Sequence, residues 1–317
     1  MKPIIKTSLF AVLFILLISA CGKEKKTTKA GVKMQEFIQE ISQYTRSYNS
    51  NFILIPQNGE ELIYTDLEEE KGLNQAFLSS VNGWAIEELF YNGDPGVDDY
   101  RLAMCQKMVP TKVVLVADYL NSDSYESDAR QQCINNGFLS FPRLTNNYDY
   151  KEIPSTPHDQ NQNDVNVLSD AKNYLYLLSS SNYTDKQSYL NAIRNTNFDV
   201  VILDAFFEEE LLSSAEVNSL KTKVDGGKRL VIAYISVGSA EKYRYYWKKN
   251  WGLHRPAWLK KKYDGYKDEI WVKYWHKDWK EIMYGNDDSY FKKIINSNFD
   301  GAFMDNVEAF YTLYHKD

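Results

Sequence analysis

The stretch LVIAYI at residues 230–235, which is followed by the polar Ser236, gives the clearest indication of the fold. Its six residues are apolar in succession, a pattern typical of a strand that is buried on both faces of a parallel sheet. Similar runs recur along the chain. In order they are Phe52–Ile55, Trp84–Ile86, Val113–Ala117, Tyr174–Leu178, Val200–Leu203, Leu230–Ile235, Ile270–Tyr274 and Gly301–Met304, with Phe138–Phe141 as a possible ninth.

Amphipathic segments between these runs predict helices. Ser213 and Glu216 have the spacing of a capping box, and the helix they begin would place Val217, Leu220 and Val224 on one face. Gly226-Gly227 would stop this helix. Apolar residues at helical spacing predict further helices over residues 34–48, 124–136, 185–195 and 289–296.

Eight strands that alternate with helices over about 250–300 residues are typical of a (β/α)8 barrel, an α/β fold. An open, doubly wound parallel sheet is the main alternative. Barrel enzymes build their sites from the carboxyl ends of many strands, so polar residues at those ends favour the barrel. Any single one of them could instead cap the helix that follows. The residues that end most runs are Gln57-Asn58, Glu87-Glu88, Asp118, Asp204, Ser236 and Asp305.

The segment 146–170 is the clearest linker, because it contains Pro154, Pro157 and many Asn, Asp and Gln residues with little apolar periodicity. Three or four predicted strands precede it and five follow. Neither part has enough strands to close a barrel alone. We therefore predict one domain over residues 33–317, in which the linker crosses the surface.

The N-terminus has the features of an export signal. Lys2 and Lys6 precede the apolar stretch Leu9–Ile18, and small residues lead to Cys21. This order resembles a bacterial lipoprotein signal, in which residues 1–20 are removed and Cys21 is lipidated; a simple cleaved signal is the alternative. Residues 21–32 would then form a flexible tether. We expect a protein of the bacterial cell envelope, facing the periplasm or the outside, that touches the membrane only through its lipid anchor.

Composition excludes several classes of function. The chain has 317 residues, 25% of them charged, which is ordinary for a globular protein. Its net charge of −6 gives no basic footprint for nucleic acid, and loss of two lysines with residues 1–20 would change this charge to −8. Four histidines and three cysteines do not favour a metal site, and we predict no cofactor and a monomer. Cys105 and Cys133 could form a disulfide or remain two buried thiols.

The aromatic residues indicate a sugar ligand. Six of the seven tryptophans lie within residues 247–279, together with several tyrosines. Aromatic faces pack against the apolar faces of pyranose rings, so this segment suits the rim of a glycan cleft. Alternatively, most of these rings could fill the outer shell of the fold.

Two groups of stretches carry a family resemblance. The later group comprises residues 231–241 with Tyr243, Arg244, Trp247 and Trp251, residues 272–275 with Trp279, and residues 299–307 with Tyr311. The earlier group comprises residues 55–59, residues 82–83 with Glu87, and residues 116–119. Together they resemble the endo-α-1,4-polygalactosaminidase family (glycoside hydrolase family 114) and related extracellular barrel proteins. The earlier group resembles the family's later strands, which implies a circularly permuted barrel. Ser239 departs from the family, whose members often have glutamate there.

The resemblance implies a glycosidase that cleaves an α-linked, amino-sugar-containing polysaccharide from within the chain. Glycoside hydrolysis usually needs two carboxyl groups. The resemblance implies that Asp305 is the nucleophile and that Glu87 is the acid/base; Glu88 is the rival of Glu87, since adjacent strand residues point to opposite sides. The residues predicted to bind substrate are Asp204, Asp118, Glu241, Tyr234, Arg244, Gln57, Asn58, Lys273, Trp275 and Glu88.

Two other functions remain open from the sequence. A glycan-binding lipoprotein could keep the barrel and lose turnover, and Ser239 gives this alternative some support. A structural or partner-binding surface lipoprotein would explain the anchor, but it would not explain the acids at the strand ends.

Overall fold

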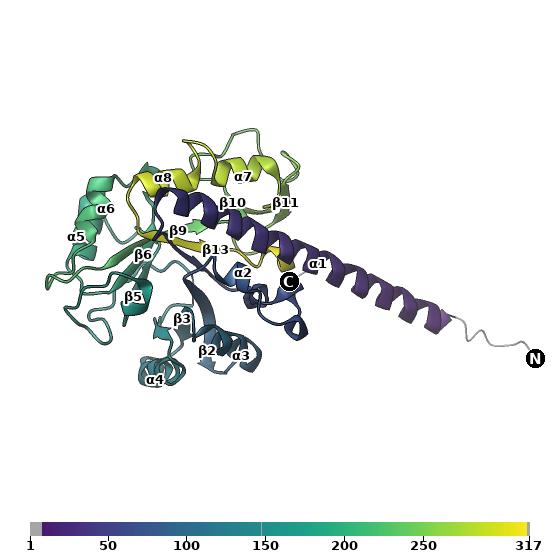
Figure 1. The fold of residues 1–317 in the computed structure, drawn as a ribbon, viewed down its shortest axis with the longest axis horizontal. Coiled ribbons are helices and arrows are strands. Elements are labelled where there is room, and N and C mark those ends of the chain that lie inside the picture. Colours follow the sequence, from purple (N-terminus) through teal and green to yellow (C-terminus); the bar gives the residue numbers. More distant parts are fainter. Residues whose placement is uncertain (1–7, 147, 316–317) are drawn as a thin grey trace, which may run out of the picture.

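The computed structural model describes residues 8–146 and 148–315, with side chains from residue 24 onward. In these residues eight parallel strands form the centre of the protein, and helices lie around the strands (Figure 1). The strands make two sheets. The five-stranded sheet has the order β1 (Ile53–Pro56), β13 (Gly301–Asp305), β9 (Leu230–Ser236), β6 (Val200–Asp204) and β5 (Tyr174–Leu177). The three-stranded sheet has the order β2 (Gly83–Pro95), β3 (Val113–Leu120) and β4 (Leu139–Ser140).

The two sheets are joined on one side. A parallel bridge pairs Gln57, just after β1, with Ala85 of β2. On the other side, Phe141 after β4 packs on Tyr174 of β5 with ring centroids 5.5 Å apart, but β4 and β5 share no hydrogen-bonded ladder in the described residues. The predicted α/β class with parallel strands is therefore confirmed, whereas a closed barrel is not detected.

The register of the parallel strands brings the predicted polar residues to one edge. Asp305 of β13 lies beside Ser236 of β9, and Asp204 of β6 lies beside Tyr234 of β9. Both acids are the last residues of their strands. Because the carboxyl ends of parallel strands meet at a common edge, acids far apart in the sequence become neighbours.

One predicted strand takes a different place. Residues 270–274 were expected in the parallel set, but β12 (Glu269–Val272) pairs antiparallel with β10 (Ser239–Glu241) and β11 (Leu259–Lys262) in a separate sheet. The possible ninth run supplies the eighth parallel strand instead, as β4. An apolar run does not reveal the direction of its partner strand, and β4 is only two residues long, so its signal in the sequence was weak.

Helix α1 (Ser8–Tyr48) packs its predicted apolar face on the domain, with Met34, Phe37 and Ile41 fully buried. It also corrects one prediction. Residues 21–32 lie within this helix, Ala30 is buried, and Thr27 lies 2.9 Å from the ring of His315, so this segment does not behave as a flexible tether. Four of the twelve residues here are lysines, which are good helix formers.

The remaining elements cover the parallel strands. They are α2 (Gln75–Leu78), α3 (Asp99–Met108), α4 (Glu126–Asn136), α5 (Lys186–Arg194), α6 (Ser214–Leu220), α7 (Lys277–Met283), α8 (Tyr290–Asn296), α9 (Ala309–Thr312), the short strands β7 (Phe206–Phe207) and β8 (Glu210–Leu211), and five 3-10 turns, η1 (Glu60–Ile63), η2 (Thr65–Leu67), η3 (Glu69–Lys71), η4 (Asp123–Tyr125) and η5 (Leu168–Asp170). Within the described residues, no helix combines the length and apolar character needed to cross a membrane.

The capping box of α6 is confirmed. The Ser213 hydroxyl accepts from the Glu216 N–H at 3.3 Å, and the Glu216 carboxylate accepts from the Ser213 N–H at 2.7 Å. The helix ends at Leu220, however, and Val224 is 53% exposed, so its place on the buried face was wrongly predicted. The Lys223 ammonium lies 2.6 Å from the buried Asp199 carboxylate, and this buried ion pair fixes the chain in a turn.

The two cysteines whose state the sequence left open are free thiols. Cys105 and Cys133 are both buried and unpaired by a disulfide. Burial raises the pKa of each thiol above its usual range, so neither is poised to react. The signal over residues 1–20 and the side chain of Cys21 lie outside the part of the chain whose side chains are described, so both remain predictions.

Candidate active site

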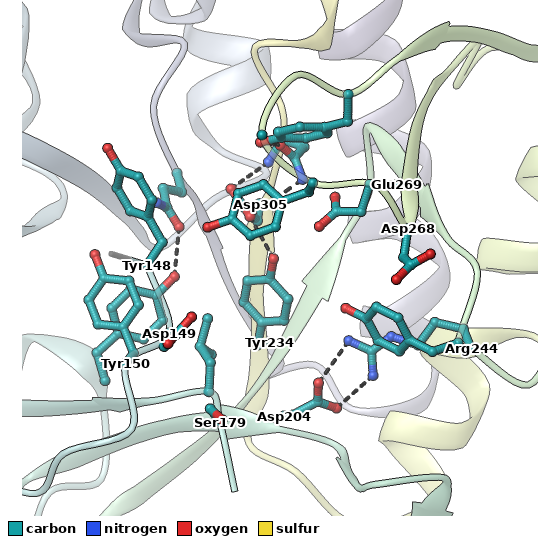
Figure 2. Close-up of a pocket in the computed structure, with 18 of the residues that line it drawn as sticks. Tyr148, Asp149, Tyr150, Ser179, Asp204, Tyr234, Arg244, Asp268, Glu269 and Asp305 are labelled. Atoms are coloured by element: carbon teal, nitrogen blue, oxygen red, sulfur yellow. Dashed lines mark hydrogen bonds and ion pairs between the residues drawn. The ribbon is translucent and has the colours of Figure 1, made fainter. Parts of the chain in front are cut away.

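A cleft of about 850 Å³ opens at the carboxyl ends of the parallel strands (Figure 2). Its lining is strongly acidic. Among the described residues that line it, nine carry carboxyl groups, namely Glu87, Asp149, Asp204, Glu208, Asp264, Asp268, Glu269, Asp305 and Glu308. Two carry cations, Arg244 and Lys267. The other polar groups come mainly from tyrosines.

Asp305 projects into this cleft from the end of β13. Its carboxylate accepts hydrogen bonds from the Tyr234 hydroxyl at 2.6 Å and from the Asn306 N–H at 2.7 Å (Figure 2). Burial raises the pKa of Asp305 to about 7, and the nearby charge of Glu87 adds to this effect. Asn306 has a left-handed φ of 62°, which turns the chain sharply after the strand.

Glu87 enters the cleft from β2, at a point where the register with β3 shifts. The Tyr150 hydroxyl donates a short hydrogen bond to its carboxylate, and the Asn58 amide lies 3.5 Å from the other oxygen. Burial raises the pKa of Glu87, while the hydrogen bond from Tyr150 and the charge of Arg143 oppose the rise.

Asp305 and Glu87 therefore form an interacting pair. Both line one cleft, both have a raised pKa, and the charge of Glu87 raises the pKa of Asp305. Two carboxyl groups that interact in this way share protons, so one can be ionised while the other is protonated near neutral pH. This is the protonation pattern that glycoside hydrolysis requires.

Glu88 takes a different position from its neighbour. Its φ of 57° is left-handed, and its carboxylate accepts from Arg143 at 2.8 Å and from the Tyr148 hydroxyl at 3.1 Å. It is not part of the cleft lining, whereas Glu87 is. Of the two candidates for the acid/base, Glu87 therefore faces the cleft and Glu88 does not.

Asp204 and Arg244 line the cleft as a rigid ion pair. The Arg244 guanidinium donates to both oxygens of Asp204, at 2.8 and 2.7 Å (Figure 2). Its Nε donates to Glu241 at 2.7 Å. Glu241 is only 1% exposed and lies behind Arg244, outside the cleft lining, so it orients the arginine. The bidentate geometry fixes the guanidinium plane.

Gln57, Asn58 and Tyr234 also line the cleft, as predicted. The Tyr176 hydroxyl donates to Gln57 at 2.9 Å. Asn58 has a left-handed φ of 59°, and its carbonyl oxygen accepts from the Glu87 N–H at 3.2 Å. Gln57 and Asn58 follow β1, and Tyr234 lies within β9, so their side chains reach the carboxylate pair from two strands.

Besides Glu88 and Glu241, three more of the predicted substrate-binding residues do not line the cleft. Asp118 is buried within the fold, where its carboxylate accepts from the backbone N–H groups of Phe90 and Tyr91 at 3.0 and 3.3 Å. Lys273 and Trp275 follow β12, which is not a strand of the parallel set, and neither lines the cleft. Trp275 instead packs below the Lys33 ammonium of α1, 4.5 Å from its ring centre.

The tryptophans were also wrongly placed at the cleft rim. In the described residues that line the cleft, the aromatic rings are tyrosines and Phe206. Trp258 and Trp279 are fully buried and pack 5.2 Å apart. Trp247 and Trp251 line a separate hollow beside them. The clustered tryptophans therefore belong mainly to a packed layer of the fold, which was the alternative to a glycan-binding rim.

Sequence reasoning missed several residues of the cleft. Tyr148, Asp149 and Tyr150 come from the linker, which was expected to be a solvated crossing. Tyr150 is 5% exposed, and its hydroxyl reaches Glu87. Glu269 belongs to the antiparallel sheet and Glu308 follows β13. Two tyrosines within a polar linker were the available signal, because exposed linkers rarely carry large aromatic residues.

Carboxyl ends of parallel strands around an acidic cleft with an interacting carboxyl pair give the arrangement that many glycoside hydrolases use. The sequence model of glycoside-hydrolase family GH114 matches residues 154–317, which is just over half of the chain, and the protein belongs to that family. The match begins inside the linker and contains Asp305. Glu87 lies before it.

Two relatives are uncharacterized proteins from distant organisms. One, from Methanocaldococcus jannaschii, is 34% identical over 152 residues, which cover 47% of this chain and 41% of the relative. The other, from Thermotoga maritima, is 29% identical over 138 residues, covering 44% of this chain and 39% of the relative. The chain thus spans about two-fifths of the length of the curated relatives that it matches.

Proposed function

We propose that this protein is an endo-acting glycosidase that cleaves an α-linked polysaccharide with Asp305 and Glu87. The observation that carries the proposal is the common cleft, in which burial raises the pKa of both carboxyl groups. Tyr234 and Tyr150 each donate a hydrogen bond to one of them, so both carboxyl groups are held in fixed orientations.

The pair reacts in the state in which its shared proton lies on Glu87. Ionised Asp305 attacks the anomeric carbon while Glu87 donates that proton to the leaving oxygen. The glycosidic bond breaks, and a glycosyl ester with Asp305 forms. Glu87, now ionised, removes a proton from water, whose oxygen attacks the anomeric carbon and releases Asp305. The assignment of the nucleophile follows the family resemblance of residues 299–307.

An amino sugar is the substrate class that suits the charge of the cleft. Nine carboxyl-bearing residues line it against two cationic ones, so a substrate with ammonium groups would be attracted and would offset the repulsion among the acids. A net charge of −6 for the chain agrees with this preference.

We further propose that the parallel strands represent a (β/α)8 barrel in circularly permuted order. Support comes from three observations. The family match begins at residue 154, β1 pairs with β13, and His315 lies beside Thr27, so segments from the two ends of the fold are neighbours. A chain rearranged to begin at residue 154, with residues 27–153 joined after residue 315, should fold and retain activity.

We also propose that the protein is exported and lipidated at Cys21, which anchors it to the cell envelope. The domain would act as a monomer and without a cofactor. The test is incorporation of labelled fatty acid in the native bacterium. Wild-type protein should incorporate the label and fractionate with membranes, and Cys21→Ala should do neither. Equal labelling of both proteins would contradict lipidation at this residue.

The direct test of function is the release of reducing ends from a panel of α-linked polymers. The panel should include a partly de-N-acetylated galactosaminogalactan, the same polymer fully acetylated, and an unsubstituted α-glucan. We expect the fastest release from the polymer with free amines, and loss of release in Asp305→Asn. Tight retention of the polymer without cleavage would identify a glycan-binding protein instead.

A further inference from the structure

We propose that Glu269 is a third functional carboxyl group of the cleft, which donates a hydrogen bond to an oxygen of the bound sugar and is joined to Asp305 through buried side chains. This inference rests on the proposed glycosidase function and deepens it, because it names a residue that contacts the substrate. Neither the predicted pair nor the predicted substrate-binding residues include Glu269.

Glu269 reaches the cleft from a different part of the fold than the catalytic pair. It is the first residue of β12, in the antiparallel sheet, and it lines the same cleft as Asp305 (Figure 2). The Ser239 hydroxyl donates to its Oε2 at 2.7 Å. Its Oε1 has no hydrogen-bond partner in the described residues, so this oxygen is available to a ligand in the cleft.

A chain of buried hydrogen bonds joins Glu269 to Asp305. The Ser239 hydroxyl, which contacts Glu269, lies 2.8 Å from the Ser236 hydroxyl. The Asn306 amide nitrogen donates to Ser236 at 2.8 Å and lies 3.4 Å from an Asp305 oxygen. Ser236, Ser239 and Asn306 are each at most 1% exposed, so substrate and water do not compete for these contacts. The chain fixes where both carboxyl groups point.

The charges around Glu269 favour its neutral form. Glu241 stands directly opposite it in the β10–β12 pair, and like charges in that arrangement repel. Burial, Glu241 and Asp305 raise the pKa of Glu269 to about 8, with the Ser239 hydrogen bond and Arg244 opposing the rise. Glu269 interacts electrostatically with seven titratable or charged groups. They are Glu241, Arg244, Asp305, Tyr234, Tyr243, Tyr263 and Tyr266.

A protonated carboxyl group has one donor, which an ionised one lacks. Ser239 donates to one oxygen of Glu269, so the proton resides on the other and is offered to the cleft. A sugar oxygen can accept it. Above pH 8 the donor is lost, and a carboxylate would face the sugar oxygen instead. Glutamine in this position keeps a neutral donor at every pH, and its carbonyl still accepts from Ser239.

The first experiment compares pH profiles of kcat/KM for the full-length wild type, Glu269→Gln, Glu269→Ala and the surface variant Glu281→Gln. We expect Glu269→Gln to stay within about threefold of wild type at pH 7 and to retain more activity at pH 9. Glu269→Ala should lose at least tenfold at pH 7. Glu281→Gln should follow the wild type. Thermal unfolding of each variant checks that it folds.

The second experiment measures binding without turnover, in the Glu87→Gln background, with one defined oligosaccharide. Titration of the ligand changes the affinity of both proteins equally, because the same ligand is used throughout, so it cancels from their comparison. From pH 7 to pH 9 the affinity should fall about tenfold more in this background than in the protein that also carries Glu269→Gln. Equal pH dependence in both proteins, or wild-type activity in Glu269→Ala, would overturn the inference. Absence of turnover by the wild type on every polymer would instead overturn the proposed function.

Discussion

Arg101 shows how one side chain can organise the candidate active site from outside the cleft. From α3, its guanidinium donates to the Glu87 backbone carbonyl at 2.9 Å and to the Asn58 side-chain carbonyl at 2.9 Å. It is anchored by the buried Glu60 carboxylate at 3.0 Å. Because the Asn58 oxygen is turned toward Arg101, its amide nitrogen faces the Glu87 carboxylate. Arg101 is therefore a positioning residue.

Arg101→Lys should lower kcat at least tenfold and change KM less than threefold, since a lysine ammonium cannot reproduce the forked contacts. The pH profile should also shift, because the orientation of Asn58 influences Glu87. Steady-state kinetics on the cleaved polymer checks this. Arg130→Lys is the matched control, because Arg130 pairs with Glu126 within α4, away from the cleft. Unchanged kcat in Arg101→Lys would contradict the positioning role.

Asp118 was predicted to bind substrate, and its contacts give it a structural role instead. Asp118→Ala should lower the free energy of unfolding by about 1–3 kcal/mol, since two backbone N–H groups lose their acceptor in the core. Urea denaturation measures the loss. A variant as stable as wild type but weaker in substrate binding would restore the original prediction.

The linker over residues 146–170 is part of the candidate active site. Its start places Tyr150 against Tyr176 of β5, with ring centroids 3.9 Å apart, and presents the Tyr150 hydroxyl to Glu87. Farther along, Val165 and Leu168 are buried and hold the segment on the domain. A connection between two halves of the chain thus completes the environment of the proposed acid/base.

Tyr150→Phe should raise the pKa of Glu87 further, because the hydroxyl that stabilises its charged form is removed. We expect the limb of the pH–rate profile that depends on Glu87 to move to higher pH, with a smaller change in KM. Tyr148→Phe is the control, since its hydroxyl bonds to Glu88. A shift of equal size in the control would contradict a specific effect on Glu87.

For the whole molecule, buried carboxyl groups link stability to pH. The pKa of Asp118 is raised to about 6, that of Asp305 to about 7 and that of Glu269 to about 8. The folded protein therefore keeps protons that the unfolded chain releases near pH 4. Unfolding releases them, so stability should fall as pH rises from about 4 and should level off above the folded pKa values.

Thermal unfolding from pH 5 to pH 8.5 checks the sign, and the wild-type Tm should fall over this range. Asp118→Asn keeps an acceptor and cannot ionise, so its Tm should fall less than that of the wild type. Asp118 accounts for at most about 3 kcal/mol of the pH-dependent change in the free energy of unfolding. Glu281→Gln should follow the wild type, because this glutamate is exposed. A wild-type Tm that rises over the range would contradict the burial of these carboxyl groups.

Sequence patterns predicted the strands that are fully buried, because a continuous apolar run such as residues 230–235 leaves little choice of structure. Strand ends and the family resemblance together predicted that Asp305 and Glu87 share one cleft. The patterns offered β4 only as a possible strand, gave β12 the wrong direction, misplaced the tryptophans, and missed Tyr150 and Glu269. These features depend on which distant segments pair or pack, and local periodicity does not identify such partners.

The proposed function depends most on the joint action of Asp305 and Glu87. The most direct measurement is the initial rate of reducing-end release by wild type, Asp305→Asn, Glu87→Gln and the surface control Glu281→Gln, on the best polymer and at the optimum pH. We predict losses of at least a thousandfold in both cleft variants and a rate within about twofold of wild type in the control. Substantial activity in either cleft variant would contradict the proposed pair.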